Sequence, residues 1–574
     1  MYLTNLTVEG FRGLEKLELR FREGLNVLVG PNNAGKTAVV DALRVLLTTG
    51  EEGALRITDY DLHVVKGGLK ATQTTFKYIF RGLDETEEAD FLAALKSVKK
   101  GDGTVEYEAH LTVRYSNADE GGRLRVKRWC GDHEENFITS EMLEDLRAVY
   151  LPPLRDPAQG LKPSRSSQLS RLVQRLSDEM SRKEVVDALA KLDADLKTKK
   201  PIADTQAAIS KRHIEMLGDL LSQELAVNLS PSDFQRVAAR LSLAVANFEV
   251  DQNGLGFNNL IYMAVVLSEL VLSKEAAYRA LIVEEPEAHL HPQLQAVLLQ
   301  YLKAVEKPVQ GEKAVQVFVT SHSPNFASLA DIDSIGCVYH SPTIIDAFFP
   351  REVAFEKRKK EKLQRYLNVT RAEIFFARRI IFVEGAAEMF MVEVLAAKLK
   401  IDLRKHSVSV ISADGLNFDA FLPLFGEKAL KVRVAVITDS DPLGIYPKAG
   451  EHHEMSAAAK VIAACADAYV KPFLALKTLE YDLALSAKNR VTMLEALSDI
   501  HPIIAKELAV DVGTAAEDDK ARVLFQGMFE RGNGKVNVQK GAYGQALAQA
   551  ISSDGLDIDV PSYLDEALKF ITAP

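Results

Sequence analysis

The stretch that decides the fold of this chain is Gly30-Pro31-Asn32-Asn33-Ala34-Gly35-Lys36-Thr37. It matches the pattern GxxxxGK[ST] of a phosphate-binding loop. An apolar run, 25–29, precedes it and predicts a buried strand, while the apolar residues of 36–47 recur at helical spacing. Strand, loop and helix in this order are the context that the motif requires, so the sequence predicts an α/β domain with a nucleotide site.

Each residue type in this loop has a physical role toward ATP. Gly30, Asn33 and Gly35 lie where backbone N–H groups close around the phosphates, and the start of a helix adds a favourable dipole. Lys36 is expected to reach the β- and γ-phosphates, and the hydroxyl of Thr37 is expected to ligate Mg²⁺. The alternative is a chance match in a glycine-containing turn, which the flanking strand and helix disfavour.

A second apolar run, 281–283, delivers two acids, Glu284 and Glu285, at its carboxyl end. This is the edge at which α/β sheets bind their ligands. We expect Glu284 to hold Mg²⁺ through water, and Glu285 to orient or deprotonate the water that attacks ATP. His322 follows another apolar run, 317–319, and either senses the γ-phosphate or is a structural histidine.

The C-terminal part carries a second set of carboxylates. Glu384 follows a predicted buried strand, 380–383, and Glu388 lies four residues later, which returns it to the same face if a helix starts there. A further apolar strand runs into Asp439 and Asp441, and residues two apart on a strand face one side. Four carboxylates at strand ends predict a hard-oxygen site for Mg²⁺ or Mn²⁺, the alternative being a solvated acidic rim.

The composition limits the classes of protein that need consideration. The three cysteines are far apart and show no CxxC spacing, which predicts reduced thiols in a cytoplasmic protein and no zinc site. No apolar run is long enough to cross a bilayer. The net charge of −10 repels nucleic acid, so DNA binding would need a local basic face. The runs 123–128, 197–200 and 357–362 are candidates, although such runs are more often solvated surface.

The chain divides into segments of different character. A proline-containing stretch, 151–163, indicates a boundary, and apolar residues at helical spacing then predict a helical insertion at about 165–235. This insertion is either a helical subdomain packed on its own chain or an oligomerisation arm. A second change of character places a domain boundary between about 365 and 378.

The order of these motifs resembles the ABC-type ATPases related to SMC and RecF proteins. The segment 253–260 falls where that superfamily has its signature motif, and the resemblance implies that Gly254 and Gly256 close on ATP bound by another copy. The chain departs from the pattern at two places. No serine stands where the signature normally has one, and Glu284 stands where aspartate is commoner.

The C-terminal acids resemble the Toprim motif, and two later segments resemble those of the OLD (overcoming lysogenization defect) nucleases. The segment 476–483 resembles the OLD "LE-x-DL" motif, which implies that Glu480 joins the metal site. The segment 540–548 resembles the late "KG" motif, in which Lys540 is expected to neutralise charge on the scissile phosphate.

The resemblance to the OLD family implies a complete architecture and activity. Residues 1–375 are expected to form an ABC-type ATPase domain, and 376–574 a Toprim nuclease domain, both α/β. The activity implied is an ATP-regulated DNA endonuclease with two Mg²⁺ or Mn²⁺ ions, which acts in anti-phage defence or DNA processing. A homo-oligomer, as a dimer or a dimer of dimers, is expected, and a helicase partner is left open.

Three other functions fit parts of the sequence. A RecF-like DNA-repair ATPase would bind DNA without cutting it, and the C-terminal acids disfavour this alternative. A strand-passing topoisomerase needs a tyrosine nucleophile on a separate domain, and its usual ATPase lacks this phosphate loop. A primase normally brings a zinc module, which three scattered cysteines cannot form.

Overall fold

The computed structural model places most of the chain. It describes residues 1–573 apart from 49–54, 66, 100, 102, 118, 120, 154–159, 166, 229–232, 246–247, 250–251, 274, 311, 342–343, 449–450, 452 and 533–535. Part of the boundary stretch 151–163 therefore lies outside the described residues. Within the described ranges, no helix has the length and apolar character needed to cross a membrane.

The chain begins with an antiparallel sheet of order β2-β1-β4-β6-β5, in which β7 also pairs with β6. Its strands are β1 (Tyr2–Phe11), β2 (Leu14–Arg20), β4 (Gln73–Arg81), β5 (Leu95–Lys99), β6 (Val105–Ser116) and β7 (Arg125–Cys130). The short helix α2 (Glu85–Asp90) follows β4, and α3 (Ser140–Glu144) follows β7. Apolar residues alternate with polar ones along β1 and β2, so each strand buries one face.

A second, mainly parallel sheet carries the phosphate loop. Its order is β14-β13-β3-β12-β11-β8, and only β14 runs antiparallel to its neighbour. The strands are β3 (Leu25–Val29), β8 (Leu146–Leu151), β11 (Tyr278–Glu284), β12 (Gln316–Ser321), β13 (Ile335–His340) and β14 (Ile345–Phe348). Strands β3 and β11 are not neighbours, because β12 lies between them and pairs in parallel with both.

Helices cover both faces of this parallel sheet. Helix α1 (Lys36–Leu47) packs in a core shared by the two sheets, and the hydroxyl of Tyr78 donates to the carbonyl of Ala42 over 2.5 Å. On the other face lie α9 (Leu255–Val271), α10 (Pro292–Ala304) and α11 (Pro324–Leu329). Strand β3 and helix α1 confirm the elements predicted on either side of the loop, and the α/β class is confirmed.

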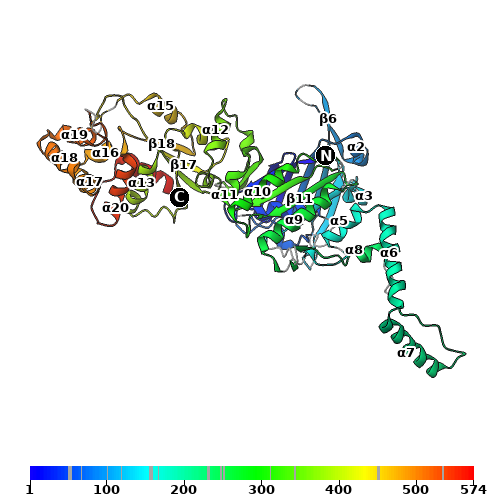
Figure 1. Ribbon diagram of the computed structural model, residues 1–574. Helices are drawn as coiled ribbons and strands as arrows, with labels where there is room; N and C mark the ends of the chain where they lie inside the picture. The colour runs from blue at the N-terminus through cyan, green and yellow to red at the C-terminus, as the bar shows by residue number, and fades with distance from the viewer. Residues whose placement is uncertain are drawn as a thin grey trace.

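Helices occupy most of the segment 165–235 that was predicted as a helical insertion. It comprises α5 (Gln168–Leu176), α6 (Glu179–Lys197), α7 (Lys200–Leu217) and α8 (Phe234–Ala238), followed by the two-residue strands β9 (Ala244–Val245) and β10 (Phe248–Glu249). Helices α6 and α7 bury none of their residues and project away from the rest of the molecule (Figure 1). We call α6 and α7 the arm.

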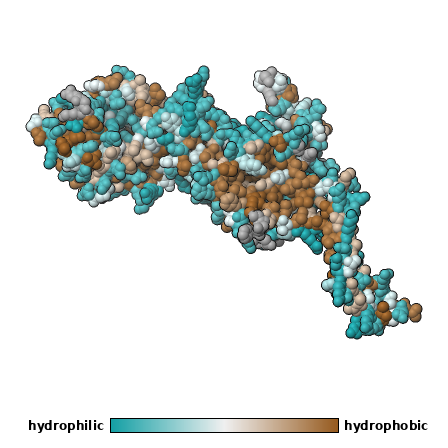
Figure 2. Space-filling model, viewed as in Figure 1, coloured by the Kyte–Doolittle hydropathy of each residue, from teal (hydrophilic) through white to brown (hydrophobic). Residues whose placement is uncertain are grey.

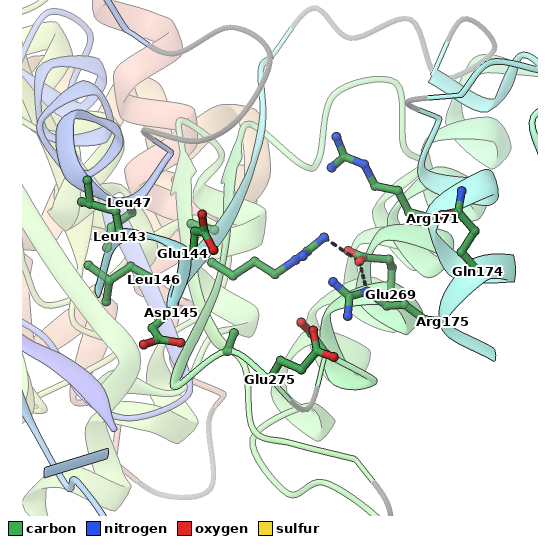
Figure 3. A pocket seen from close by; sticks show the side chains of 14 residues that line it. Leu47, Leu143, Glu144, Asp145, Leu146, Arg171, Gln174, Arg175, Glu269 and Glu275 are labelled. Carbon is green, nitrogen blue, oxygen red and sulfur yellow. Dashed lines mark hydrogen bonds and ion pairs between the residues drawn. The ribbon is translucent and has the colours of Figure 1, made fainter. Parts of the chain in front are cut away.

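Ion pairs fix the base of this insertion to the parallel sheet. The buried carboxylate of Glu269 on α9 accepts from Arg147 on β8 over 2.6 Å and from Arg175 on α5 over 2.5 Å (Figure 3). These side chains line a cavity together with Asp145, which immediately precedes β8. The cavity therefore lies at the amino ends of the parallel strands, whereas the phosphate loop follows the carboxyl end of β3.

The C-terminal part forms a parallel sheet of order β16-β15-β17-β18. Its strands are β15 (Arg379–Val383), β16 (Val408–Ser412), β17 (Arg433–Asp439) and β18 (Val470–Ala475). The helices around it are α13 (Ala386–Lys398), α14 (Phe418–Phe421), α15 (Ala457–Ala463), α16 (Leu479–Leu485), α17 (Ala487–Ile500), α18 (Pro502–Thr514), α19 (Lys520–Phe529), α20 (Lys540–Ser552) and α21 (Ser562–Thr572). Helix α12 (Lys359–Tyr366) precedes the sheet.

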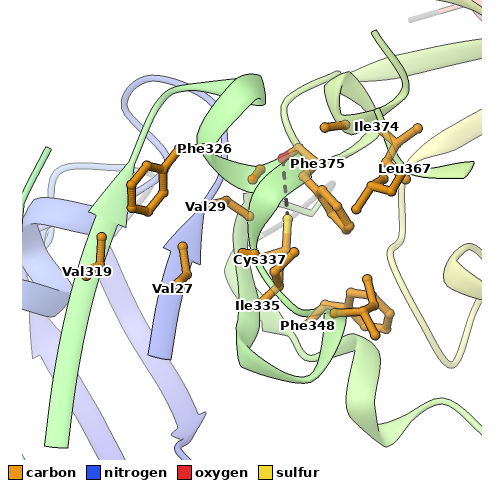
Figure 4. Packing of buried hydrophobic residues seen from close by; sticks show 14 of the residues in the cluster. Val27, Val29, Val319, Phe326, Ile335, Cys337, Phe348, Leu367, Ile374 and Phe375 are labelled. Carbon is orange, nitrogen blue, oxygen red and sulfur yellow. Dashed lines mark hydrogen bonds between the residues drawn. The ribbon is translucent and has the colours of Figure 1, made fainter. Parts of the chain in front are cut away.

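The two parts share one continuous apolar core. Residues of β3 and β12 pack in the same cluster as Phe375 of the predicted boundary and Phe382 of β15, and Figure 4 shows Val29, Cys337 and Phe375 within it. Arg371 crosses the predicted boundary, donating to the carbonyl of Ser412 over 3.0 Å. The segment predicted as a boundary is therefore packed against both domains.

Candidate functional site

The phosphate loop has positive φ angles and a close backbone approach at its glycines. Gly30 has a φ of 149°, and a Cβ added there would lie 2.0 Å from the carbonyl oxygen of Val338. Gly35 has a φ of 96° and caps the start of α1, and Asn33 also has a positive φ, 64°. A side chain at Gly30 would thus collide with β13, so the loop can close only with glycine at this position.

Lys36 is buried inside this loop. Its ammonium donates to the carbonyls of Gly30 over 2.6 Å and Pro31 over 2.8 Å. Burial lowers the pKa of Lys36 to about 8, although Cys337, Glu285 and Glu287 act to raise it. Phosphate oxygens would give this ammonium the anionic partners that two neutral carbonyls do not provide.

Thr37 and Glu284 meet across the parallel sheet. The hydroxyl of Thr37 donates to Oε2 of Glu284 over 3.2 Å. Burial raises the pKa of Glu284, although hydrogen bonds from Tyr150 and Thr37 oppose the shift. The hydroxyl and carboxylate expected to hold Mg²⁺ are therefore adjacent, and both are hard oxygen ligands of the kind that this ion takes.

Two further groups lie at the carboxyl ends of β11 and β12. Glu285 has a φ of 46°, and its Oε1 lies 3.5 Å from Nε2 of His322. Burial lowers the pKa of His322, and the positive charge of Lys36 lowers it further. The structure thus brings together Lys36, Glu284, Glu285 and His322, all of which the sequence proposed for nucleotide chemistry.

Sequence reasoning missed three residues at this site. Oε1 of Glu287 accepts from the hydroxyl of Ser321 over 2.6 Å, and its buried Oε2 has no hydrogen-bond partner within the described part of the chain. Nε2 of His340 lies 2.9 Å from the carbonyl oxygen of Asn33, and the hydroxyl of Tyr150 donates to Glu284. Glu287 belongs to the acidic run after β11, but no local signal marked His340 or Tyr150.

The proposed signature segment forms the start of α9. Gly254 is the N-cap of this helix, and a Cβ on Gly256 would lie 2.6 Å from the carbonyl oxygen of His289. Leu255 and Phe257 are exposed beside them. The close approach explains Gly256 within one chain, and the role of Gly254 and Gly256 toward ATP in another copy stays a prediction.

The second site lies at the carboxyl ends of β15 and β17. Oε1 of Glu384 accepts from the hydroxyl of Thr438 over 2.5 Å and from the backbone N–H of Asp439 over 2.9 Å. Helix α13 starts two residues later, and Glu388 in its first turn accepts from the backbone N–H of Gly385 over 3.0 Å. Two strands and one helix start thus supply three carboxylates to one place.

Lys540 compensates part of this negative charge. Its ammonium lies 3.0 Å from Oε2 of Glu480 and 3.9 Å from Oδ2 of Asp439. Burial alone would lower the pKa of Lys540, but the carboxylates outweigh burial and raise it. Helix α20 can bring Lys540 this close because Gly544 packs on α13, where a Cβ would lie 2.8 Å from the Cα of Ala387.

The position of Asp441 contradicts the prediction that Asp439 and Asp441 face the same side of one strand. Strand β17 ends at Asp439, and Asp441 lies beyond it with a φ of 47° and an exposed side chain. The rule that residues two apart face one side therefore does not apply to this pair, because it holds only within a strand. Among the described residues, no three His, Cys, Asp or Glu side chains form a group that could hold a metal ion as they stand.

The residues of the second site nevertheless fit a divalent cation in their chemistry. Burial, followed by the negative charge of Glu384, raises the pKa of Asp439 well above its usual range, and burial also raises the pKa of Glu388. Oε1 of Glu480 is buried and accepts no hydrogen bond from the described residues. A hard cation would supply the positive charge that these oxygens lack.

Comparison with known proteins identifies both halves of the chain. Residues 1–120 and 149–327, more than half of the chain, match the family described as AAA ATPase domain. Residues 375–441 match the family described as Overcoming lysogenization defect protein-like, TOPRIM domain. The chain belongs to the OLD nuclease family. The predicted order of an ATPase domain and a Toprim domain is thereby confirmed.

The individual relatives are distant in sequence, and two of them extend over most of the chain. The OLD nuclease of Thermus scotoductus is 24% identical over 480 residues, covering 78% of this chain and 84% of that protein. Endonuclease GajA of Bacillus cereus is 19% identical over 452 residues, covering 77% and 75%. The solved C-terminal region of the Burkholderia pseudomallei OLD protein is 24% identical over 34% of this chain and 97% of that one, with a TM-score of 0.25.

Proposed function

We propose that this OLD-family nuclease is an ATP-hydrolysing, divalent-metal-dependent DNA endonuclease. The observation that carries the proposal is a cluster of acids and one lysine in the domain that lacks the phosphate loop: Lys540 lies beside Asp439 and Glu480, and Glu384 accepts from the backbone N–H of Asp439. Acids alone would suit many metal sites, but a lysine within reach of the same acids suits a phosphodiester substrate.

In the ATPase domain, each residue is assigned one task. Gly30, Asn33 and Gly35 shape the loop around the phosphates, and Lys36 pairs with the β- and γ-phosphates. Thr37 and Glu284 would hold Mg²⁺, which when bound neutralises charge between the phosphates. Glu285 orients or deprotonates the attacking water, and His322 contacts the γ-phosphate.

Replacing Glu285 by Gln is expected to leave ATP binding unchanged and to slow its hydrolysis by about 10²–10⁴-fold, the usual contribution of a general base. Glutamine keeps the shape of the side chain but cannot accept the proton. Phosphate release and binding of a fluorescent ATP analogue would be measured on the same preparation. Wild-type turnover in this variant would remove Glu285 from the proposed role.

In the Toprim domain, Glu384, Glu388, Asp439, Asp441 and Glu480 are the residues proposed to hold divalent ions. Two bound ions supply an activated water and charge stabilisation at the leaving oxygen. Lys540 would exchange its pairing with Glu480 for a phosphate oxygen of DNA and neutralise the charge that develops there. Asp441, being exposed, would join the others when its turn closes over the site.

Regulation by ATP is proposed because one hairpin contacts the phosphate loop and the C-terminal domain. Nε2 of His340 on β13 lies 2.9 Å from the carbonyl oxygen of Asn33 in the phosphate loop. Near the same end of the hairpin, Asp346 of β14 lies 3.4 Å from Nζ of Lys431. Lys431 stands two residues before β17, and Asp439 ends this strand. We infer that a movement of the loop on nucleotide binding would reach the second site through the length of β17.

We predict a homo-oligomer, a dimer or a dimer of dimers, built partly on the arm. The arm buries none of its residues within this chain, and Leu176, Met180, Met216 and Leu220 are exposed at or near it. Figure 2 shows further apolar surface over the region of α9. Light scattering at micromolar protein, with and without ATP, should give a multiple of the 63.3 kDa chain mass. A monomeric mass under both conditions would contradict the prediction.

The experiment that tests the function is incubation of the purified protein with supercoiled plasmid and Mg²⁺ or Mn²⁺, with and without ATP. Nicked or linear DNA that disappears in EDTA supports the proposal. DNA binding without cutting under every condition would favour a RecF-like ATPase. The cellular role proposed, anti-phage defence with DNA as substrate and a helicase as a further partner, rests on the resemblance to the OLD family.

A further inference from the structure

Tyr150 holds the acid expected to bind Mg²⁺ beside the nucleotide. Its hydroxyl donates to Oε1 of Glu284 over 2.6 Å, while Thr37 donates to Oε2 of the same carboxylate over 3.2 Å. Two hydroxyls from opposite sides therefore act on the two oxygens of one buried acid. The carboxylate plane is fixed by this pair, because rotation about its last bond would break both hydrogen bonds.

The position of Tyr150 follows from the sheet. Strand β8 pairs in parallel with β11, and Tyr150 lies opposite Ile282, two residues before Glu284. A tyrosine side chain is long enough to reach this diagonal distance along the edge strand. Glu284 carries one more methylene than the aspartate that commonly stands at this place, so its carboxylate has an additional freely rotating bond that must be restrained.

Tyr150 is itself held by a chain of charged groups. The guanidinium of Arg44 lies 3.9 Å from the centre of the Tyr150 ring, over its face. Arg44 also donates to Oδ1 of Asp41 over 2.7 Å, and Oδ2 of Asp41 accepts from Arg12 over 2.5 Å. Arg44 and Asp41 lie on α1, which starts at Lys36, so the tyrosine is anchored to the helix that carries the phosphate loop.

We propose that Tyr150 is a positioning residue for Mg²⁺-dependent ATP hydrolysis. It orients Glu284 so that the carboxylate and the hydroxyl of Thr37 face the ion together. Tyr150 touches neither the phosphates nor the attacking water in this account, and its effect passes through Glu284. The inference rests on the proposed ATPase function, since it specifies which residue sets the Mg²⁺ requirement of that reaction.

The alternative is that the phenol only stabilises the edge of the sheet. The two roles make different predictions. Removing a group that only stabilises the fold lowers the melting temperature and leaves the Mg²⁺ dependence of the folded enzyme unchanged. Removing a positioning group raises the Mg²⁺ concentration that hydrolysis requires, because the ion then meets a carboxylate that is no longer oriented. The contacts that the loop makes with ATP in the absence of Mg²⁺ stay intact.

The test is Tyr150→Phe, which removes the hydroxyl and keeps the ring stacked on Arg44. We expect the Mg²⁺ concentration for half-maximal ATP hydrolysis to rise by about 10–100-fold, the effect of losing a hydrogen bond to a charged group. Binding of a fluorescent ATP analogue in EDTA should stay at the wild-type level. The matched control is Tyr278→Phe, which removes a buried tyrosine hydroxyl that donates to Gln316 over 2.8 Å on the same strand as Glu284.

The outcomes separate this inference from the function on which it rests. Wild-type Mg²⁺ dependence in folded Tyr150→Phe, or an equal change in Tyr278→Phe, would overturn the role of Tyr150. Absence of Mg²⁺-dependent hydrolysis in the wild-type protein would overturn the ATPase function instead. If Tyr150→Phe does not fold, 3-fluorotyrosine placed at position 150 gives a second measurement. Its ¹⁹F resonance should move when Mg²⁺ is added to the ATP-bound protein, and an unmoved resonance would also overturn the inference.

Discussion

Replacing Lys36 by Ala is expected to weaken ATP binding by at least about a hundredfold. The ammonium donates to two carbonyls of its own loop, and it is the cation expected to meet two phosphates. Charge-assisted hydrogen bonds to such groups contribute about 1.5–3 kcal/mol each. The measurement is titration with a fluorescent ATP analogue, with phosphate release on the same preparation.

The matched control for Lys36→Ala is Lys77→Ala, which removes an exposed lysine from β4 of the same domain. This variant should bind ATP as the wild-type protein does. A folded Lys36→Ala variant with unchanged affinity and turnover would show that 30–37 is not the nucleotide site, whatever its match to the phosphate-loop pattern.

Replacing Asp439 by Asn, or Glu384 by Gln, is expected to eliminate DNA cleavage. Removing a residue that only holds a metal ligand in place typically lowers metal affinity or activity by about 10–100-fold. Removing a direct ligand should lower DNA cleavage by more than this. The Asp439→Asn variant should fold, because burial and neighbouring acids already raise the pKa of this group. Asparagine replaces a buried carboxylate whose ionisation is unfavourable in the folded protein.

Plasmid nicking with Mg²⁺ and with Mn²⁺ measures this effect. The matched control is Asp554→Asn, an exposed acid of the same domain, which should nick plasmid at the wild-type rate. Cleavage at the wild-type rate by both Asp439→Asn and Glu384→Gln would exclude the Toprim site as the nuclease and would favour a non-cutting ATPase.

The phosphate loop shows what sequence can predict. Its geometry is local, since the strand 25–29, the glycines and the helix 36–47 are consecutive, and the structure places them as β3, loop and α1. The acids after β11, β15 and β17 were also found, because parallel strands end at one edge of a sheet. Each of these predictions needed only a short window of sequence.

Contacts between distant segments could not be predicted in this way. Tyr150 meets Glu284 only because β8 pairs with β11, and 134 residues separate the two. Lys540 was proposed from a resemblance, but its pairing with Glu480 depends on α20 packing on α13 through Gly544. The placement of Asp441 failed for a local reason, because the chain turns after β17 and alternation ends there.

The central claim is that one chain performs two reactions at two separate sites. It is tested most directly by measuring phosphate release from ATP and plasmid nicking on the same Asp439→Asn and Glu384→Gln preparations. The account predicts ATP hydrolysis at the wild-type rate with no cleavage of DNA in either variant. Cleavage that persists while ATP hydrolysis is lost would contradict it.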